Sequence, residues 1–435
     1  MTQLRGAGCE LSGERALATR NSQLDTFIAG GGPAGAALAL RLAQLGHTVT
    51  VAERSPFDRT RPGESLHPGA RTLLESLGIT DAPFLRVAKT LVRWSGDTDV
   101  VEHEGLAIGR PHLERFLLDR AREAGAKVLQ PSAADARPSS RFVVDASGRA
   151  SWSRAPRTRT GVPTTAIAAH WRGRALPRES RIEALEDGWL WGSPLPNGSF
   201  SAMAFVDAGS DASGARLDSM LRASQLFRDL RGSRGDVRRH DATTYTCDLP
   251  WDAWLLRIGE ASFSLDPLSA SGVLAALQSA VHAAAALHTV LTHPERTELA
   301  MQFLIEAQKA AVAQHKQWTA QFYAQSRFAS APFYAKRAMG EAARATGNGQ
   351  RATSYALAED VRIADVPCLV DDLIESRRGV VQPQSRPFVW LGGREVAPLL
   401  ADLERGPRSA DELKDAWGAV VLEALVRSRI VVPSP

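Results

Sequence analysis

The chain has 435 residues, of which 44% are hydrophobic and 23% charged, and its formal net charge is +4 at pH 7. The length fits two or three packed units, and the composition is that of a soluble globular protein. The sequence has no run of about 18 apolar residues, so we expect no membrane span. It also lacks a basic tract of about five residues, which argues against a nucleic-acid partner.

The first 24 residues carry several charged side chains and no apolar block. We therefore predict a disordered extension over residues 1–24 rather than a signal peptide. The three cysteines, Cys9, Cys247 and Cys368, are widely spaced and fit neither a disulfide framework nor a metal-ligand spacing. We expect no metal site, and a cytoplasmic location, because that compartment keeps cysteines reduced.

A nucleotide-binding motif follows the extension. The apolar run 26–29 predicts a buried strand, and it leads directly into a glycine-rich stretch that satisfies G-x-G-x-x-G. In this motif the first glycine permits a tight turn, the second lets a pyrophosphate approach the backbone, and the third lets the helix pack on the strand. A helix over 36–45, a strand over 48–52 and then Glu53 complete the βαβ unit, with the acid placed to bind a ribose hydroxyl. The motif glycines are Gly30, Gly32 and Gly35.

Later segments distinguish FAD from NAD. A strand runs into a small-residue turn over 143–149, and a second strand ends at 258–261. The small-residue loop 267–272 then opens a helix over 273–287, and a helix N-terminus suits an anionic or electron-rich ligand. Sites spread from the first glycine motif to this loop indicate one extended cofactor that crosses the domain.

This set of motifs resembles the group A flavin monooxygenases and their relatives, the flavin-dependent halogenases and geranylgeranyl reductases, over roughly residues 25 to 340. The resemblance implies FAD and an external reductant, NAD(P)H or a reduced flavin. The FAD is expected to be non-covalent, because no Cys or His in the flavin motifs suggests a covalent link. The residues that the resemblance places against FAD are Gly30, Gly32, Gly35, Glu53, Arg54, Arg110, Glu260, Asp266, Pro267 and Gly272.

We predict an α/β fold. A Rossmann-like FAD-binding domain holds an inserted antiparallel β-sheet substrate domain, and a helical extension and a small C-terminal winged-helix-like module follow. The sheet is predicted from strand-like runs at 164–171, 182–186, 189–193 and 199–206. The expected boundaries are 25–163 and 240–296 for the FAD-binding domain, 164–239 for the substrate domain, 297–361 for the helical extension, 362–385 for a linker and 386–435 for the module.

The candidate catalytic residues lie in the stretch 63–68, which passes close to the flavin in the resembling family. Glu64 and His67 are its titratable residues, and His67 is a candidate general base or substrate-positioning group. The alternative for His67 is a histidine hydrogen-bonded within its own loop. For Arg110 and Asp266 the alternatives are a helix-start arginine and an N-capping carboxylate.

Halogenation is one alternative activity. The stretch 189–194 resembles the W-x-W-x-I-P signature of halogenases, with Ser193 in place of Ile. Their flavin-side loop has the pattern Pro-Leu-Glu-Ser-Thr-Gly, whereas here Ser269 stands where the glutamate belongs. They also need a lysine, and the surroundings of Lys89 do not match the halogenase pattern. We therefore expect hydroxylation.

The segment 317–334 resembles a subfamily of flavoproteins that mature tryptophylquinone cofactors in bacterial amine dehydrogenases. That resemblance implies hydroxylation of a tryptophan in a partner polypeptide by molecular oxygen, through a flavin C4a-hydroperoxide. Acidic and basic residues nearly cancel in the C-terminal module, which favours a protein contact over DNA. The remaining alternatives are a hydroxylase or reductase of a small aromatic or lipid metabolite, and a flavin-bound regulator that reads DNA.

Overall fold

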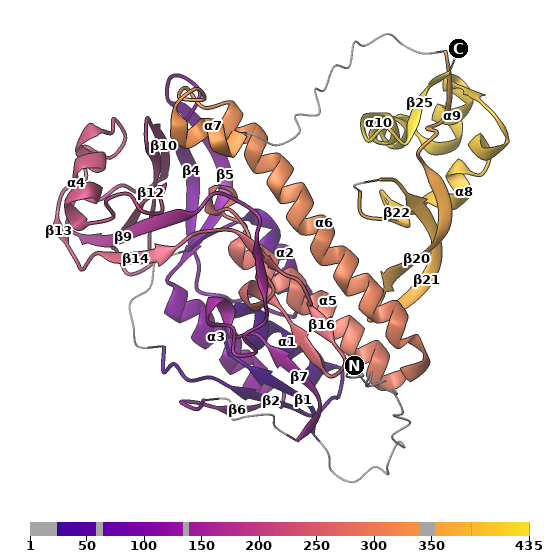
Figure 1. Ribbon diagram of the computed structural model, residues 1–435, viewed down its shortest axis with the longest axis horizontal. Helices are drawn as coiled ribbons and strands as arrows, with labels where there is room; N and C mark the ends of the chain where they lie inside the picture. The colour runs from indigo at the N-terminus through magenta and orange to yellow at the C-terminus, as the bar shows by residue number, and fades with distance from the viewer. Residues whose placement is uncertain (1–23, 58–63, 134–138, 339–352, 384, 435) are drawn as a thin grey trace, which may run out of the picture.

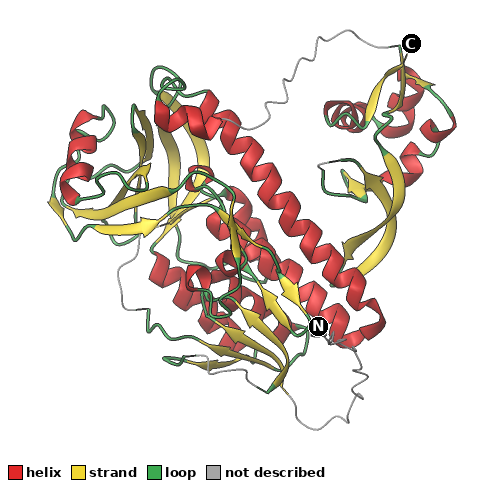
Figure 2. Ribbon diagram, in the orientation of Figure 1, coloured by secondary structure: helices red, strands yellow, loops and turns green. Residues whose placement is uncertain are grey.

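The computed structural model describes residues 24–57, 64–133, 139–338, 353–383 and 385–434. The expected extension over residues 1–24 lies outside this part except for Leu24. The described chain forms a Rossmann-like layer, a broad second sheet and a C-terminal unit, with the long helix α6 (Thr297–Ala324) running past all three (Figures 1 and 2).

The Rossmann-like layer is a six-stranded sheet with the order β16-β17-β7-β1-β2-β6. Five of its strands are parallel, and only the edge strand β16 is antiparallel. The central strands are buried on both faces, as their near-continuous apolar sequences require. The strands are β1 (Leu24–Ala29), β2 (Val49–Ala52), β6 (Lys127–Leu129), β7 (Ser140–Asp145), β16 (Trp251–Asp252) and β17 (Leu255–Arg257).

Three helices pack together beside this sheet: α1 (Pro33–Gln44), α3 (Arg110–Glu123) and α5 (Gly272–Thr292). Their apolar side chains share one core cluster with the sheet residues Ile28, Val51 and Val144. Helix α5 is long and apolar enough to cross a membrane, but 61% of its apolar window is buried inside the protein, as in the core helix of a globular domain.

The second sheet has nine strands, in the order β13-β9-β12-β11-β10-β4-β5-β3 with β14 also paired to β9. The four strands expected between 164 and 206 are present, as β9 (Thr164–Arg172), β10 (Ser180–Leu185), β11 (Gly188–Pro194) and β12 (Phe200–Asp207). The helix α4 (Gly214–Ala223) packs against this sheet. The remaining strands are β3 (Glu64–Leu66), β4 (Leu85–Arg93), β5 (Asp99–Ile108), β13 (Ser233–Arg234) and β14 (Arg238–Asp241).

This sheet corrects two expectations. Strands β3 to β5 lie in the segment assigned to the FAD-binding domain, yet β4 pairs with β10, and β5 and β3 follow at the edge. The sheet therefore draws on residues 64–108 as well as 164–241. The sheet is also not wholly antiparallel, because β4 and β10 are parallel. Pairing between strands so far apart in sequence leaves no local signal.

The helix α2 (Pro68–Ser76) connects β3 to β4, and a small sheet joins β8 (Arg157–Arg159), β15 (Tyr245–Cys247) and β18 (Phe263–Ser264).

The expected helical extension over 297–361 is helical as α6 and α7 (Pro332–Ala338), but it ends in the strand β19 (Ser354–Leu357). The expected linker over 362–385 is wrong. Residues 362–381 form the hairpin β20 (Arg362–Val370) and β21 (Leu373–Val381), with nine paired positions. Pro367 is tolerated because each strand of a two-stranded ribbon has a free edge.

The hairpin joins the FAD-binding layer to the C-terminal unit. Ile374 is fully buried in the core cluster of α1, α3 and α5, and its N–H donates to Thr289 Oγ1 of α5 at 2.8 Å. Val380, near the other end of β21, belongs to the core of the C-terminal unit.

The C-terminal unit combines three short helices with a sheet of β24, β19 and β25. Ser409 and Glu412 form a capping box at the start of α9. The winged-helix-like class of the module stays a prediction. The elements are β22 (Trp390–Leu391), β23 (Arg394–Glu395), α8 (Val396–Leu400), β24 (Arg408–Ser409), α9 (Ala410–Trp417), α10 (Ala419–Arg427) and β25 (Val431–Ser434).

Candidate FAD and substrate site

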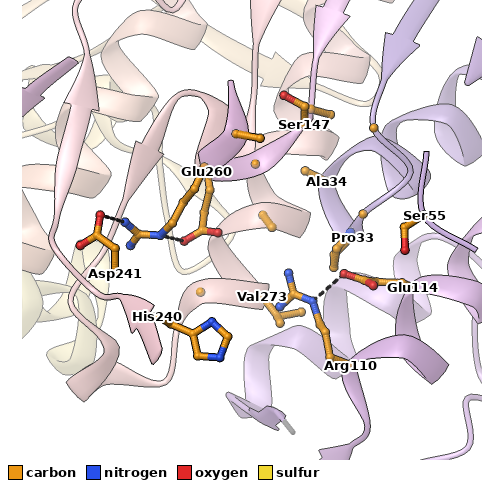
Figure 3. Close-up of a pocket in the computed structure, with 18 of the residues that line it drawn as sticks. Pro33, Ala34, Ser55, Arg110, Glu114, Ser147, His240, Asp241, Glu260 and Val273 are labelled. Atoms are coloured by element: carbon orange, nitrogen blue, oxygen red, sulfur yellow. Dashed lines mark hydrogen bonds and ion pairs between the residues drawn. The ribbon is translucent and has the colours of Figure 1, made fainter. Parts of the chain in front are cut away.

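A cavity of about 1030 Å³ lies between the two large sheets. Its walls come from the carboxyl ends of β1, β2 and β7, from the first turns of α1, α3 and α5, and from β11, β12 and β14 (Figure 3). In open α/β sheets, ligands bind outside the carboxyl ends of the parallel strands, so the cavity lies where a dinucleotide is expected.

The three motif glycines have separate roles. Gly30 has φ +107°, and a Cβ on Gly30 would meet the carbonyl oxygen of Ala146 at 2.6 Å. A Cβ on Gly35 would meet the carbonyl oxygen of Gly30 at 2.0 Å, so α1 can pack against the turn only if residue 35 is glycine. A Cβ on Gly32 would meet nothing within 4 Å and would stand in the cavity. The packing of the protein does not require glycine at position 32. The absence of a side chain there instead leaves room for a ligand close to the backbone.

Glu53 lies at the end of β2 and closes the glycine turn. Its carboxylate is buried and accepts hydrogen bonds from the backbone N–H of Gly31 and of Ser55, each at 2.6 Å. Each carboxylate oxygen has two acceptor positions, so both can still accept from a ribose hydroxyl. Arg54 is exposed and lines the same part of the cavity.

Arg110 opens helix α3 and lines the cavity beside Pro33 (Figure 3). Its Nε donates to Glu114 Oε1, one helical turn later, at 2.9 Å, and Glu114 is almost completely buried. The buried carboxylate fixes the guanidinium at the cavity wall. Arg110 is thus a helix-start arginine, and it is also placed to meet a ligand.

An ion-paired group lies on the opposite wall. Arg149 donates through Nε to Glu260 at 3.2 Å and approaches Asp241 Oδ2 at 3.4 Å (Figure 3). Its guanidinium lies over the ring of Tyr245, whose hydroxyl donates to the Glu260 carbonyl oxygen at 2.6 Å. Burial, together with the negative charge of Glu260, raises the pKa of Tyr245 to about 12. Glu260 therefore meets the cavity as part of an ion pair, not as a lone carboxylate.

Arg149, His240 and Asp241 all line the cavity, and sequence analysis assigns none of them a role. Arg149 directly follows the small-residue turn of β7, which was a usable signal. His240 and Asp241 lie on β14, whose polar sequence has no pattern that marks it as a cavity wall.

The loop before α5 forms part of the cavity wall. The Asp266 carboxylate accepts from Leu268 N–H at 3.0 Å and from the Tyr323 hydroxyl at 3.2 Å, and burial raises its pKa. The N-capping alternative for Asp266 is therefore real, and the residue lines the cavity as well. Pro267 and Gly272 line the cavity beside it, with the first turn of α5.

Of the two candidate catalytic residues, only His67 has a side chain that the structure describes. The backbone of Glu64 pairs with Ile108 in β3, but its side chain lies outside the described part of the chain. His67 is exposed, does not line the cavity, and accepts from Gly69 N–H through Nδ1 at 3.1 Å as the N-cap of α2. The loop-bonded alternative thus describes His67 in this structure.

An aromatic wall faces the cavity from the nine-stranded sheet. Trp189 and Trp191 lie two residues apart on β11, so they project from one face of the strand, and both line the cavity with Met203 and Phe205 of β12. Trp189 is buried and stacks on Phe205 at 3.9 Å between ring centroids. Core packing therefore accounts for Trp189, while Trp191 is only partly buried.

These features fit FAD. The open space at Gly32, the carboxylate of Glu53 and Arg110 at the start of α3 suit the adenosine and pyrophosphate, and the start of α5 suits an electron-rich ring. Except for Gly35, which packs α1 against the glycine turn, the residues expected to bind the cofactor line a single cavity rather than separate sites.

Comparison with known proteins points the same way. A family model described as tryptophan halogenase matches residues 25–98. The tryptophan 2-halogenase of Chondromyces crocatus is 27% identical over 325 residues, which are 62% of this chain and 62% of that protein. The chain spans about three-fifths of the length of the curated halogenases that it matches, between 60% and 64% for three of them.

Two solved structures match over nearly the whole chain. QhpG, a peptidyl tryptophan dihydroxylase essential for tryptophylquinone cofactor biogenesis, is 26% identical with a TM-score of 0.73, and the match covers 93% of this chain and 99% of QhpG. The flavin-dependent halogenase CmlS is 19% identical with a TM-score of 0.79, covering 95% and 96%. The resemblance inferred from the motifs is confirmed: the chain is an FAD-dependent oxidoreductase similar to the flavin-dependent halogenases and monooxygenases.

Proposed function

We propose that the chain is an FAD-dependent monooxygenase that hydroxylates an aromatic ring, and that this ring is a tryptophan of a partner polypeptide. The observation that carries the proposal is the aromatic wall of Trp189, Trp191, Met203 and Phe205, which lines the same cavity as the loop 266–272. Aromatic and thioether side chains offer an indole ring a matched apolar surface.

Bound FAD supplies the activation of oxygen. The protein's own residues bind and orient the reactants. Glu53 and Arg110 hold the adenosine half, the first turn of α5 directs its positive end to the flavin half, and Trp191 positions the substrate ring. We also propose that an external reductant, NAD(P)H or a reduced flavin, supplies the electrons.

The polypeptide substrate is supported by the match to QhpG, which covers 93% of this chain and so cannot leave out the C-terminal unit as a whole. None of the described residues of that unit lines the cavity, so its role is sought outside cofactor binding. We propose that it holds the partner polypeptide while the target tryptophan enters the cavity. Capture remote from the reacting ring aids catalysis by orienting that ring.

Halogenation is the second candidate, because the family model and CmlS both describe halogenases. Two observations weigh against it. Ser269 replaces the glutamate of the halogenase loop, and no lysine lines the cavity among the described residues. Lys89 lies exposed on β4, away from the cavity wall.

The substrate can be tested with isotope-labelled oxygen gas. The holoenzyme is reduced and offered the polypeptides encoded beside its gene, and in parallel free L-tryptophan. We expect label in a tryptophan of one polypeptide, at a kcat/KM at least about tenfold above that for the free amino acid. Efficient oxidation of a free aromatic or lipid, with every polypeptide unlabelled, would support the small-molecule alternative instead.

A further inference from the structure

A continuous series of aromatic rings connects the cavity with the protein surface. Trp189 lines the cavity, and its ring lies 6.3 Å from that of Trp94. Trp94 lies 5.1 Å from Phe322, and Phe322 stacks on Trp318 at 5.2 Å. Trp318 is 42% exposed, whereas Trp94 and Trp189 are 3% and 1% exposed. We call Trp189, Trp94, Phe322 and Trp318 the aromatic path.

The rings of the path are fixed by contacts from several elements. Trp94 Nε1 donates to the Phe322 carbonyl oxygen at 2.8 Å, which ties the end of β4 to α6. Phe322 and Trp318 lie one helical turn apart on α6, so their stacking follows from helix geometry. The path thus runs from the cavity, through the core between the nine-stranded sheet and α6, to solvent.

Tyr323 adds a site that can release a proton. Its ring lies 6.1 Å from Trp94, and its hydroxyl donates to the Asp266 carboxylate at the cavity. Burial beside that carboxylate raises the pKa of Tyr323 far above its ordinary value, so the phenol is neutral. A neutral phenol can lose an electron readily only if its proton has an acceptor, and Asp266 provides one.

We propose that the aromatic path carries oxidising equivalents out of the cavity when oxygen is reduced there without a substrate being oxidised. Indole and phenol are among the side chains most easily oxidised by one electron, and two indoles, Trp189 and Trp94, stand with the phenol of Tyr323 between the cavity and Trp318. Phe322 acts as a bridge between two of the indoles. This inference rests on the oxygen chemistry of the proposed function, but not on the identity of its substrate.

Each transfer along the aromatic path moves one electron. A reactive oxygen species in the cavity, such as a hydroxyl radical, takes one electron from Trp189 or Tyr323 and one proton, and becomes water. If Tyr323 is oxidised, its hydroxyl proton moves to Asp266 and returns to the phenol oxygen when an electron from Trp94 reduces the tyrosyl radical. Electrons then move inward from Trp94 and from Trp318, so the radical ends on Trp318, which releases its Nε1 proton to solvent. A small-molecule thiol donates one hydrogen atom to that radical and becomes a thiyl radical, and two thiyl radicals from two such events combine to a disulfide.

Without thiol, the radical on Trp318 reacts with oxygen and leaves an oxidised tryptophan that peptide mass spectrometry can locate. The holoenzyme is turned over with reductant and air, without substrate or thiol. Trp390 of the C-terminal unit is the control, because it is 38% exposed and lies outside the path. We expect several-fold more oxidation at Trp318 than at Trp390, and loss of this excess in W94F. Equal oxidation at both sites, or an excess that W94F leaves unchanged, would contradict the proposal.

W94F removes a hydrogen bond in the core, so a second comparison uses surface variants. W318F and W390F replace tryptophans of similar exposure by the same residue. Under the same turnover, W318F should lose its bound flavin and its capacity to consume oxygen several-fold faster than the wild type, while W390F should not. Equal lifetimes would overturn the proposal. Failure of the reduced holoenzyme to consume oxygen would instead overturn the proposed function, and this inference with it.

Discussion

Gly32 and Gly35 are three residues apart, yet glycine is required at the two positions for different reasons. At Gly35 the constraint is internal, because a Cβ would meet the Gly30 carbonyl oxygen at 2.0 Å. At Gly32 the backbone is extended and the space beyond it is open to the cavity. The two positions therefore allow the demands of folding and of cofactor binding to be measured separately.

We expect Gly32→Val to abolish FAD binding while leaving the apoprotein folded, because the new side chain occupies only the cavity. Gly35→Ala should destabilise the apoprotein by about 1–3 kcal/mol or more, because the backbone must move. Flavin absorbance after gel filtration measures binding, and thermal unfolding of the apoprotein measures stability. A G32V protein that binds FAD normally would show that the pyrophosphate does not lie at this turn.

At the residue scale, sequence reasoning finds the groups that a local motif fixes. The glycines and Glu53 belong to one βαβ unit, so their spacing predicts their contacts. Arg149 lies 111 residues before Glu260 and 92 residues before Asp241 in the sequence. Only the folded structure therefore shows that the three form one ion-paired group. His67 fails as a cavity residue for the same reason, since its sequence neighbourhood does not say which way the loop turns.

Helices α5 and α6 bury a histidine between them. His282 of α5 packs edge-on against Phe303 of α6 at 5.3 Å between ring centroids. Burial, with the nearby charge of Arg386, lowers the pKa of His282 to about 4. The folded protein therefore keeps His282 neutral at pH values where the unfolded chain is already protonated.

This arrangement predicts that acid lowers the free energy of unfolding through His282, between α5 and α6. Because the folded-state pKa is depressed, the stabilisation is complete above pH 6.5 and is lost as the pH falls from 6.5 to about 4. The loss from His282 is at most about 3 kcal/mol. His282→Gln should flatten the fall in unfolding free energy over this range, whereas His112→Gln, at an exposed position on α3, should not. Denaturant titrations at several pH values measure both, and parallel curves for H282Q and wild type would refute the assignment.

The hairpin of β20 and β21 shows where element-level reading fails. Its sequence mixes arginines with apolar residues and contains a proline, so it looked like a linker. In the structure, the buried residues of β21 lie near its two ends, and Ile374 at one end enters the core of the FAD-binding layer. A ribbon held by packing on α5 has no strong pattern of its own, because half of its surface faces solvent.

If Ile374 anchors the C-terminal unit, Ile374→Ala should destabilise that attachment by about 2–4 kcal/mol. Limited proteolysis should then cleave within residues 353–383 several-fold faster than in the wild type. The control is Leu373→Ala, because Leu373 is only partly buried and points to the other face of the strand. Equal protection of I374A and L373A would mean that the anchoring lies elsewhere.

At the scale of the whole molecule, one cavity receives residues from both large sheets and from α1, α3 and α5. The Rossmann-like layer and the four central strands of the second sheet follow from sequence patterns. The entry of residues 64–108 into that second sheet does not, because it depends on pairing between distant strands. The cavity that results combines a cofactor cradle with an aromatic wall, and it is this combination that the proposed hydroxylation requires.

The most direct test of that proposal is a choice between oxygen and halide in one reaction. The reduced holoenzyme is mixed with oxygen, an excess of bromide and the candidate polypeptide, and the product is analysed by intact mass and peptide sequencing. The account predicts a tryptophan that has gained oxygen atoms and carries no bromine, at a rate that bromide does not change. A product with bromine in place of a ring hydrogen, formed at a comparable rate, would contradict it and assign the cavity to halogenation.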